Sequence, residues 1–168
     1  MIRIFLIASL IISNYTLAEY TNSNGKALEK PFKDLIKWVR SDVEPKLAQI
    51  DVSSEWQTIN LNEADNYIIW IGHSTFLIKK EGITILTDPV FSDRASPFKN
   101  VGPERLIPPA MSINQLPKID FVTVSHNHYD HLDINSLKEI SKLHSEAIFF
   151  VPIGDGKLLK RKRIKNVY

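Results

Sequence analysis

Three of the five histidines in the chain lie within six consecutive positions, close to two carboxylates. Imidazole and carboxylate groups are ligands that zinc, iron and manganese accept in proteins. The chain contains no cysteine, so disulfide scaffolds, thiol nucleophiles and cysteine-based zinc fingers are excluded, and histidine and carboxylate would hold any transition metal. The segment reads Ser125-His126-Asn127-His128-Tyr129-Asp130-His131-Leu132-Asp133.

The spacing within this segment favours a metal centre. His126 and His128 are two positions apart, so an extended backbone places both imidazoles on one side. Asp130 and His131 come where a helix would begin, so they can turn towards a neighbouring point. Such a set can serve two metal ions about 3.5–4 Å apart. A solvated histidine-rich loop, or histidines bonded to the backbone, is the alternative, and the clustering makes the metal centre the favoured interpretation.

The elements that must position these side chains follow from hydrophobic patterning. Short β-rich runs come first, a largely apolar strand directly precedes the histidines, and a helix with Asp133 as its N-cap follows them. Strands followed by helices predict an α/β fold. A Pro-rich stretch over 88–118 is long enough to be functional or disordered. The expected strands are Tyr67–Ile71, Ser74–Lys79, Ile83–Thr87, Ile119–Val124 and Ala147–Val151, and the expected helices are Leu132–Leu143 and Asp155–Lys162.

Four residues outside the histidine segment have side chains that could serve the same site. Asp88 follows an apolar strand, and its carboxylate could hydrogen-bond a metal-binding imidazole, although a strand-end turn is the alternative. His73 lies at a strand boundary, where it could support a metal ligand, face the substrate, or simply satisfy a turn. Arg94 and Arg105 lie in the Pro-rich stretch and could face a phosphate or form surface salt bridges.

The amino terminus has the pattern of an export signal over residues 1–18. A positive charge at Arg3 precedes the apolar run Ile4–Ile12, and Thr16-Leu17-Ala18 resembles a cleavage site. A nine-residue helix is about 14 Å long, too short for a hydrocarbon core of about 30 Å. We therefore predict export to the periplasm or the medium, with a buried strand or helix and an uncleaved anchor as alternatives.

Residues 19–66 form an extension ahead of the domain that we expect over 67–168. A polar lead-in over 19–26 precedes apolar residues at helical spacing behind Pro31, which is an allowed position in a first helical turn. This amphipathic helix is expected to pack on the domain surface, and docking onto lipid or a partner is the alternative. The apolar residues at helical spacing are Phe32, Leu35, Ile36 and Val39.

The charge of the chain is unevenly distributed. There are 21 basic and 19 acidic residues, and six of the basic ones lie near the carboxyl end, which leaves 15 basic against 19 acidic elsewhere. A general nucleic-acid-binding charge is therefore excluded. The basic cluster is expected to be a solvated helix face or frayed tail, with anionic lipid or nucleic acid as alternative partners. Its members are Lys157, Lys160, Arg161, Lys162, Arg163 and Lys165.

The pattern His126-x-His128-x-Asp130-His131 resembles the signature of the metallo-β-lactamase fold, an αββα sandwich of hydrolases. More narrowly, the stretch from Tyr67 to Gly154 is similar to the N-acyl-phosphatidylethanolamine-hydrolysing phospholipase D branch. The segments that carry this similarity are Trp70-Ile71-Gly72-His73-Ser74-Thr75, Leu86-Thr87-Asp88-Pro89-Val90-Phe91-Ser92-Asp93-Arg94-Ala95-Ser96-Pro97, Leu116-Pro117-x-Ile119-Asp120 and Phe150-Val151-Pro152-x-Gly154.

The resemblance implies a zinc-dependent hydrolase. His126 and His128 would bind a first zinc ion, and Asp130 and His131 a second. In the family, a third ligand for each ion and a bridging carboxylate come from the carboxy-terminal half. A hydroxide shared by the two ions attacks the phosphorus of a phosphodiester lipid, and Asp130 would also help to orient it as a catalytic residue.

The chain departs from the family in length and in ligand number. Family members are longer, and the only histidine after His131 is His144, which we expect to face solvent or pack. We therefore expect an amino-terminal half of the sandwich with half of the metal ligands. Three interpretations remain: an exported zinc hydrolase completed by a second chain or a symmetric partner, a truncated non-catalytic remnant, and a metal-binding or membrane-surface module. Half a sandwich would expose an apolar sheet face, which predicts a dimer, a complemented complex or aggregation.

Overall fold

The computed structural model describes residues 33, 34, 36, 37, 54–98 and 100–168. The chain divides into two compact units, Met1–Ala48 and Gln49–Tyr168. In the first unit, the four described residues are helical, which agrees with the amphipathic helix expected there. The export signal over 1–18, the polar lead-in and the rest of that helix lie outside the described residues. Within the described part, no helix has the length and apolar character needed to span a bilayer.

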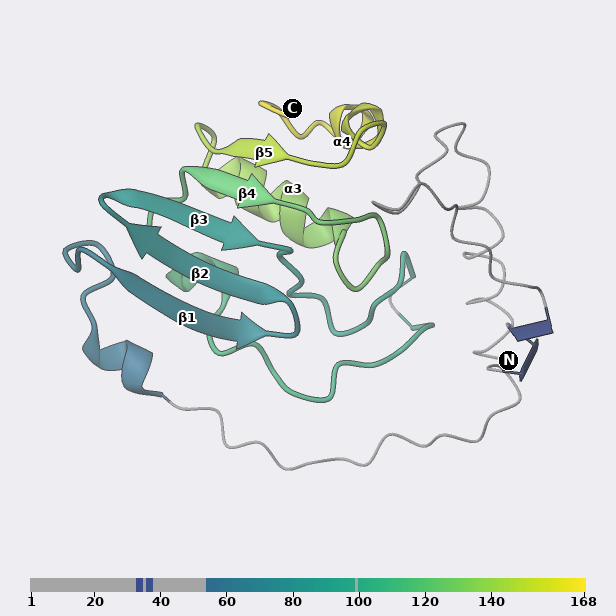
Figure 1. Cartoon of the computed structure of the whole chain (residues 1–168), viewed down its shortest axis with the longest axis horizontal. Helices are drawn as coiled ribbons and strands as arrows, with labels where there is room; N and C mark the ends of the chain where they lie inside the picture. The colour runs from purple at the N-terminus through teal and green to yellow at the C-terminus, as the bar shows by residue number, and fades with distance from the viewer. Residues whose placement is uncertain (1–32, 35, 38–53, 99) are drawn as a thin grey trace, which may run out of the picture. The chain divides into compact units, whose positions relative to one another are not determined.

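Five strands form one sheet in which spatial order follows chain order (Figure 1). β1 pairs with β2 and β2 with β3 in antiparallel fashion, whereas β3–β4 and β4–β5 are parallel. Four strands therefore run in one direction and β2 runs against them, so the carboxyl ends of β1, β3, β4 and β5 lie at one edge. The strands are β1 Tyr67–Gly72, β2 Thr75–Lys80, β3 Ile83–Thr87, β4 Phe121–Thr123 and β5 Ile148–Phe150.

The predicted strands and helices are confirmed, with differences at their ends. The predicted ranges around β4 and β5 are longer than the strands themselves, yet Val124 still donates its N–H to the Phe150 carbonyl at 2.9 Å. Ladder bonds thus continue past the assigned ends, as is usual at strand boundaries. The helical segments are the 3₁₀ turns η1 Glu55–Thr58 and η2 Ile113–Gln115, and the helices α3 Ile134–Leu143 and α4 Gly156–Arg161.

Asp133 caps α3, as the sequence predicts. Its carboxylate accepts the backbone N–H groups of Asn135 at 3.0 Å and Ser136 at 3.4 Å, which would otherwise lack partners in the first turn. The same carboxylate accepts the N–H of Ser92 at 3.0 Å. One buried side chain therefore begins the helix and ties it to the stretch that leaves β3.

One face of the sheet forms the core together with α3. Alternate residues of each strand point to this face, and in the registers Leu77 pairs with Leu86, and Leu86 with Val122. Leu137 and Ile140 of α3 belong to the same buried cluster, and α3 lies behind the sheet in the view of Figure 1. The residues that the sheet contributes to this cluster are Tyr67, Ile69, Ile71, Leu77, Leu86, Val122 and Phe149.

The opposite face of the sheet is also apolar, but it is exposed. Ile68 is 72% exposed, Phe150 is 46% exposed, and Trp70 and Phe76 are each 36% exposed. This agrees with the expectation of an exposed apolar sheet face. The strand registers align two rows across this face, Ile68–Ile78–Ile85–Phe121–Ile148 and Trp70–Phe76–Thr87–Thr123–Phe150.

The Pro-rich stretch is held by its arginines. Arg94 forms an ion pair with Glu104 at 2.9 Å and donates to the Gly102 carbonyl at 2.8 Å. Arg105 donates to the carbonyls of Val90 and Ser92, and its burial lowers the pKa of the guanidinium. Both arginines stabilise this stretch; Arg94 makes the predicted salt bridge, whereas Arg105 bonds backbone oxygens.

Residues ahead of β1 also pack onto the core. Trp56, Leu61 and Ala64 lie against the buried cluster, and the Tyr67 hydroxyl donates to the Leu61 carbonyl at 3.2 Å. The compact unit therefore includes part of the segment that the sequence pattern assigns to the extension over 19–66.

Candidate metal centre

The carboxyl-end edge of the sheet gathers the candidate site residues from three strands. His73 follows β1, Asp88 follows β3, and the histidine segment follows β4. Because these strands share one direction, their ends meet at the same edge, where loops of α/β proteins commonly bind ligands. All six predicted site residues come together here: His73, Asp88, His126, His128, Asp130 and His131.

A tight turn folds the histidine segment back on itself. The carbonyl of His128 accepts the N–H of His131 at 3.0 Å and that of Leu132 at 2.7 Å. As a result the His126 ring lies with its centroid 4.6 Å from that of His128 and 3.9 Å from that of His131. Extended backbone followed by a turn, as the spacing predicts, brings the three rings together.

Two groups of ligand atoms share the Asp130 carboxylate. One consists of His126, His128 and Asp130, the other of His73, Asp130 and His131, and within each group the ligand atoms lie within 4.8 Å of one another. Asp130 Oδ2 is 3.3 Å from His73 Nε2 and 3.7 Å from His131 Nε2. The arrangement can hold two ions with one carboxylate facing both.

The Asp88 carboxylate fixes which ring nitrogens are free. Its Oδ2 lies 2.9 Å from His131 Nδ1, and because an ionised carboxylate only accepts, the neutral ring carries its proton on Nδ1 and keeps a lone pair on Nε2. Ser125 donates its hydroxyl proton to the same oxygen at 2.8 Å. The Ser125 oxygen can then only accept from His126 Nδ1, 3.0 Å away, so His126 also presents Nε2.

Asp88 is itself held rigidly. It is 8% exposed, its N–H donates to the Thr123 carbonyl at 2.7 Å, and its carbonyl accepts the Thr75 hydroxyl at 2.7 Å. Its backbone has φ of 37°, a left-handed conformation that non-glycine residues seldom adopt. Neighbouring strands therefore hold this carboxylate in a strained position beside the two histidines.

His73 also has a left-handed backbone, with φ of 50°. The indole N–H of Trp70 donates to its carbonyl at 2.9 Å, which fixes the turn between β1 and β2. The sequence assigns His73 a supporting or substrate-facing role, and the structure brings its ring within reach of Asp130. A ligand role for His73 follows from the shared direction of β1 and β4, which brings it to the same edge as the histidine segment. The local sequence pattern does not give that direction.

The surroundings favour the uncharged form of His126. Burial lowers the pKa of His126, and the neighbouring imidazoles of His131 and His128 lower it further. Neutral imidazole is the form that binds metal. His144 lies outside the site, where it accepts the Ile119 N–H at 3.4 Å and burial lowers its pKa. Of the two alternatives for His144, facing solvent and packing, this contact favours packing.

A family model and several known proteins match this chain. Residues 67–167 match the family model described as the β-lactamase superfamily domain. N-acyl-phosphatidylethanolamine-hydrolyzing phospholipase D 1 of Caenorhabditis elegans is 44% identical over 103 residues, which cover 61% of this chain and 29% of that protein. The mitochondrial N-acyl-phosphatidylethanolamine-hydrolyzing phospholipase D of Saccharomyces cerevisiae is 42% identical over 101 residues, 60% of this chain and 21% of the relative.

The chain thus spans less than a third of the length of either relative. Among solved structures, isothiocyanate hydrolase from Delia radicum gut bacteria aligns with a TM-score of 0.49 and 20% identity, over 60% of this chain and 40% of that one. The family match covers more than half of the 168 residues and contains both ligand groups. The chain therefore belongs to the metallo-β-lactamase superfamily.

Proposed function

We propose that this chain is a metal-dependent hydrolase that binds two zinc ions and cleaves a phosphodiester in a phospholipid-like substrate. The observation that carries the proposal is the pair of ligand groups that share Asp130. One group would hold the first ion through His126 and His128, and the other would hold the second through His131 and His73. Imidazole nitrogen and carboxylate oxygen are ligands that zinc accepts.

The residues around the two groups would prepare the site for hydrolysis. Asp88 and Ser125 keep the Nε2 atoms of His131 and His126 available. Asp130 is 44% exposed, so its carboxylate can accept a hydrogen bond from an attacking water and orient it. When bound, the ions would supply a nucleophile from water near neutral pH and positive charge for the transition state.

The substrate class is taken from the relatives. Their names specify N-acyl-phosphatidylethanolamine as the lipid that those proteins hydrolyse. Their identity to this chain, 44% over 103 residues and 42% over 101 residues, supports a phosphodiester bond as the target. For residues 1–18 we propose an export role, which a secreted product beginning at Glu19 in its mass spectrum would support and an unprocessed intracellular product would oppose.

We propose further that association with a second polypeptide completes the coordination of both ions. The resemblance to the phospholipase D branch implies ligands beyond those named above, on a second sheet. The exposed apolar face formed by the rows beginning at Ile68 and Trp70 is the surface that such a sheet would cover. A copy of this chain or a separate chain can supply it.

Zinc stoichiometry of the purified chain tests the proposal. We expect close to two zinc ions per chain by mass spectrometry, and about one in either His126→Ala/His128→Ala or His73→Ala, because each change removes ligands of one group only. His144→Ala is the matched control, because His144 lies outside both ligand groups, and it should keep the wild-type content. The loaded chain should then hydrolyse bis(p-nitrophenyl) phosphate.

Two results would contradict the proposal. Zinc content well below one per chain, equal in wild type and His126→Ala/His128→Ala, would mean an incomplete site and favour the non-catalytic remnant. Two bound ions without phosphodiester turnover would favour a metal-binding module.

A further inference from the structure

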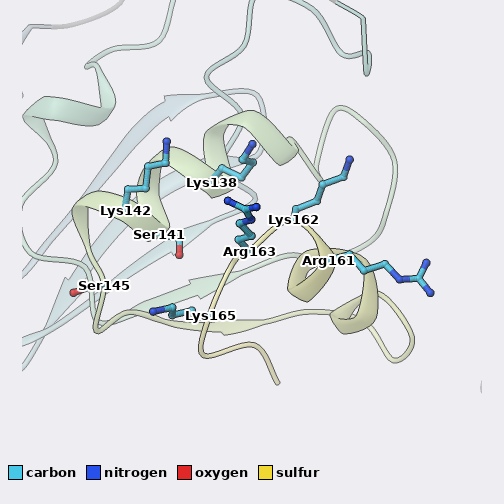
Figure 2. A pocket seen from close by; sticks show the side chains of 8 residues that line it. All are labelled: Lys138, Ser141, Lys142, Ser145, Arg161, Lys162, Arg163 and Lys165. Carbon is cyan, nitrogen blue, oxygen red and sulfur yellow. The ribbon is translucent and has the colours of Figure 1, made fainter.

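The helical side of the sheet carries a basic groove that has no part in the candidate metal centre. Its volume is about 560 Å³. Six cationic side chains and two hydroxyl groups line it, and no carboxylate does. The lining residues, labelled in Figure 2, are Lys138, Ser141, Lys142, Ser145, Arg161, Lys162, Arg163 and Lys165.

Two segments meet to form this groove. Lys138 and Lys142 are four residues apart on α3 and so share one face of the helix. The other cations come from the end of α4 and the residues after it, and Figure 2 shows Arg163 lying between the α3 lysines and that end.

The backbone that presents the second set of cations is fixed. Ile164 and Val167 are 2% and 4% exposed, and the Ile164 N–H donates to the Leu159 carbonyl at 3.1 Å. Asn166 and Tyr168 exchange backbone hydrogen bonds with Phe149 of β5. The backbone of the carboxyl-terminal segment is therefore packed and paired while its basic side chains are exposed, which favours the solvated helix face over the frayed tail among the two expectations.

The positive charge of the groove is not neutralised within the described residues. None of the six cations forms an ion pair with a carboxylate that the structure describes. Like charges concentrated on a fixed backbone create a local positive potential that attracts anions. The groove is therefore suited to a ligand with several phosphate groups.

Exposed aliphatic side chains on the same segments narrow the ligand class. Leu143, directly after Lys142, is 52% exposed, and Leu158, one helical turn before Arg161, is 39% exposed. Ile153, in the loop before α4, is 89% exposed. Cations beside exposed aliphatic groups suit a bilayer surface, where headgroups are anionic and acyl chains lie just beneath. The acidic balance outside the basic cluster disfavours a nucleic acid.

We propose that this groove binds the headgroup phosphates of anionic phospholipids at a membrane surface. The proposal rests on the proposed function, because docking there would bring the hydrolase to its lipid substrate. It names a separate site, however, and binding at the groove needs neither metal nor turnover.

Vesicle sedimentation with the full chain tests the groove. We expect binding to vesicles of phosphatidylcholine mixed with phosphatidylglycerol, with weaker binding at high salt and little binding to phosphatidylcholine alone. Lys138→Glu/Lys165→Glu should bind the anionic vesicles at least about twenty-fold more weakly, since each cation near such a surface contributes about fivefold. The matched control is Lys80→Glu/Lys118→Glu, which makes the same charge change at two exposed lysines outside the groove and should bind nearly as wild type.

Leu158→Ser separates a bilayer from soluble phosphate. It should weaken vesicle binding and leave the binding of inositol hexakisphosphate unchanged. The proposal is overturned if both double variants lose binding equally, if Leu158→Ser leaves vesicle binding unchanged, or if duplex DNA binds the groove more tightly than the vesicles. Repeating the sedimentation with a chelator keeps this result independent of the metal centre, and hydrolysis of the soluble bis(p-nitrophenyl) phosphate tests the catalytic proposal independently of the groove.

Discussion

Asp88 is the residue on which the candidate centre depends most among those that are not ligands. Through one oxygen it contacts His131 directly and His126 by way of Ser125. A single carboxylate thus sets the protonated nitrogen of two rings in different ligand groups. Residues that orient histidine ligands commonly contribute ten- to a hundredfold to metal affinity.

We predict that Asp88→Asn weakens zinc binding by about ten- to a hundredfold. The carboxylate oxygen accepts hydrogen bonds from both Ser125 and His131 Nδ1, and a neutral amide would orient these two groups less firmly. Ser125→Ala should have a smaller effect, since it frees the ring of His126 but leaves the contact between Asp88 and His131. Competition titration against a chelating dye measures both affinities.

Asp65→Asn is the control for this substitution, because Asp65 is exposed and lies ahead of β1. Its zinc affinity should equal that of the wild type. Equal affinity in Asp88→Asn would show that the histidines need no orienting carboxylate.

Among the secondary-structure elements, most strands of the sheet could be predicted from the local sequence pattern. Alternation of apolar residues and the two-residue turns predict β1, β2 and β3, and the Asp133 cap marks the start of α3. The histidine spacing also indicates a metal centre without any structure. These signals are local, because each depends on residues close together in the chain.

The features that the sequence pattern could not predict depend on pairings between distant segments. Nothing in the local pattern says that β4 lies beside β3, since a long Pro-rich stretch separates them. The position of Asp88 beside His131, and of His73 beside Asp130, follows from that pairing and from the shared strand direction. The bonds between the carboxyl-terminal segment and β5 were likewise not predictable from composition, which resembles that of a solvated tail.

His144 makes the junction between α3 and β4 sensitive to pH. Burial lowers the pKa of His144, and its Nδ1 must stay unprotonated to accept the Ile119 N–H. As the pH falls below the ordinary histidine value of about 6.5, the unfolded chain binds more protons than the native one. The contribution of neutral His144 to stability is therefore present above this pH and lost below it.

We predict that His144→Asn reduces the fall in unfolding free energy between about pH 7.5 and pH 5.5, because asparagine retains an acceptor and does not titrate. Urea unfolding at both pH values, with a chelator present, measures this difference. Glu139→Gln, a change at an exposed position of α3, should keep the wild-type pH dependence. An unchanged pH dependence in His144→Asn would place the titration elsewhere.

For the whole molecule, the two faces of the sheet have opposite environments. One packs against α3, and the other presents aligned aliphatic and aromatic rows to solvent. Exposed apolar surfaces of this kind are usually interaction sites or aggregation liabilities. The proposed association of the chain uses this face.

We predict that Ile68→Lys shifts the chain from an associated state towards monomer, because a charge within a packed sheet interface would lose its hydration. Ile68 is 72% exposed, so the substitution should leave the fold of each copy intact. Light scattering after size exclusion measures the mass, and circular dichroism checks the fold.

Leu106→Lys, at an exposed leucine of the Pro-rich stretch that belongs to neither row of this face, should leave the mass unchanged. A wild-type chain that remains a cooperatively unfolding monomer at all concentrations would contradict the association.

A sheet whose spatial order repeats its chain order also has a preferred sequence of assembly. β1, β2 and β3 close through turns of two residues, so their pairing costs little loop entropy, whereas β4 must return across the whole Pro-rich stretch. His73 and Asp88 therefore belong to the hairpins that close most readily, and the other ligands arrive with the most distant strand. An ion shared by His73 and His131 would crosslink the hairpins of β1 to β3 to the segment after β4. A crosslink that closes a long loop stabilises a fold most. The metal would then serve the architecture of the chain as well as its chemistry.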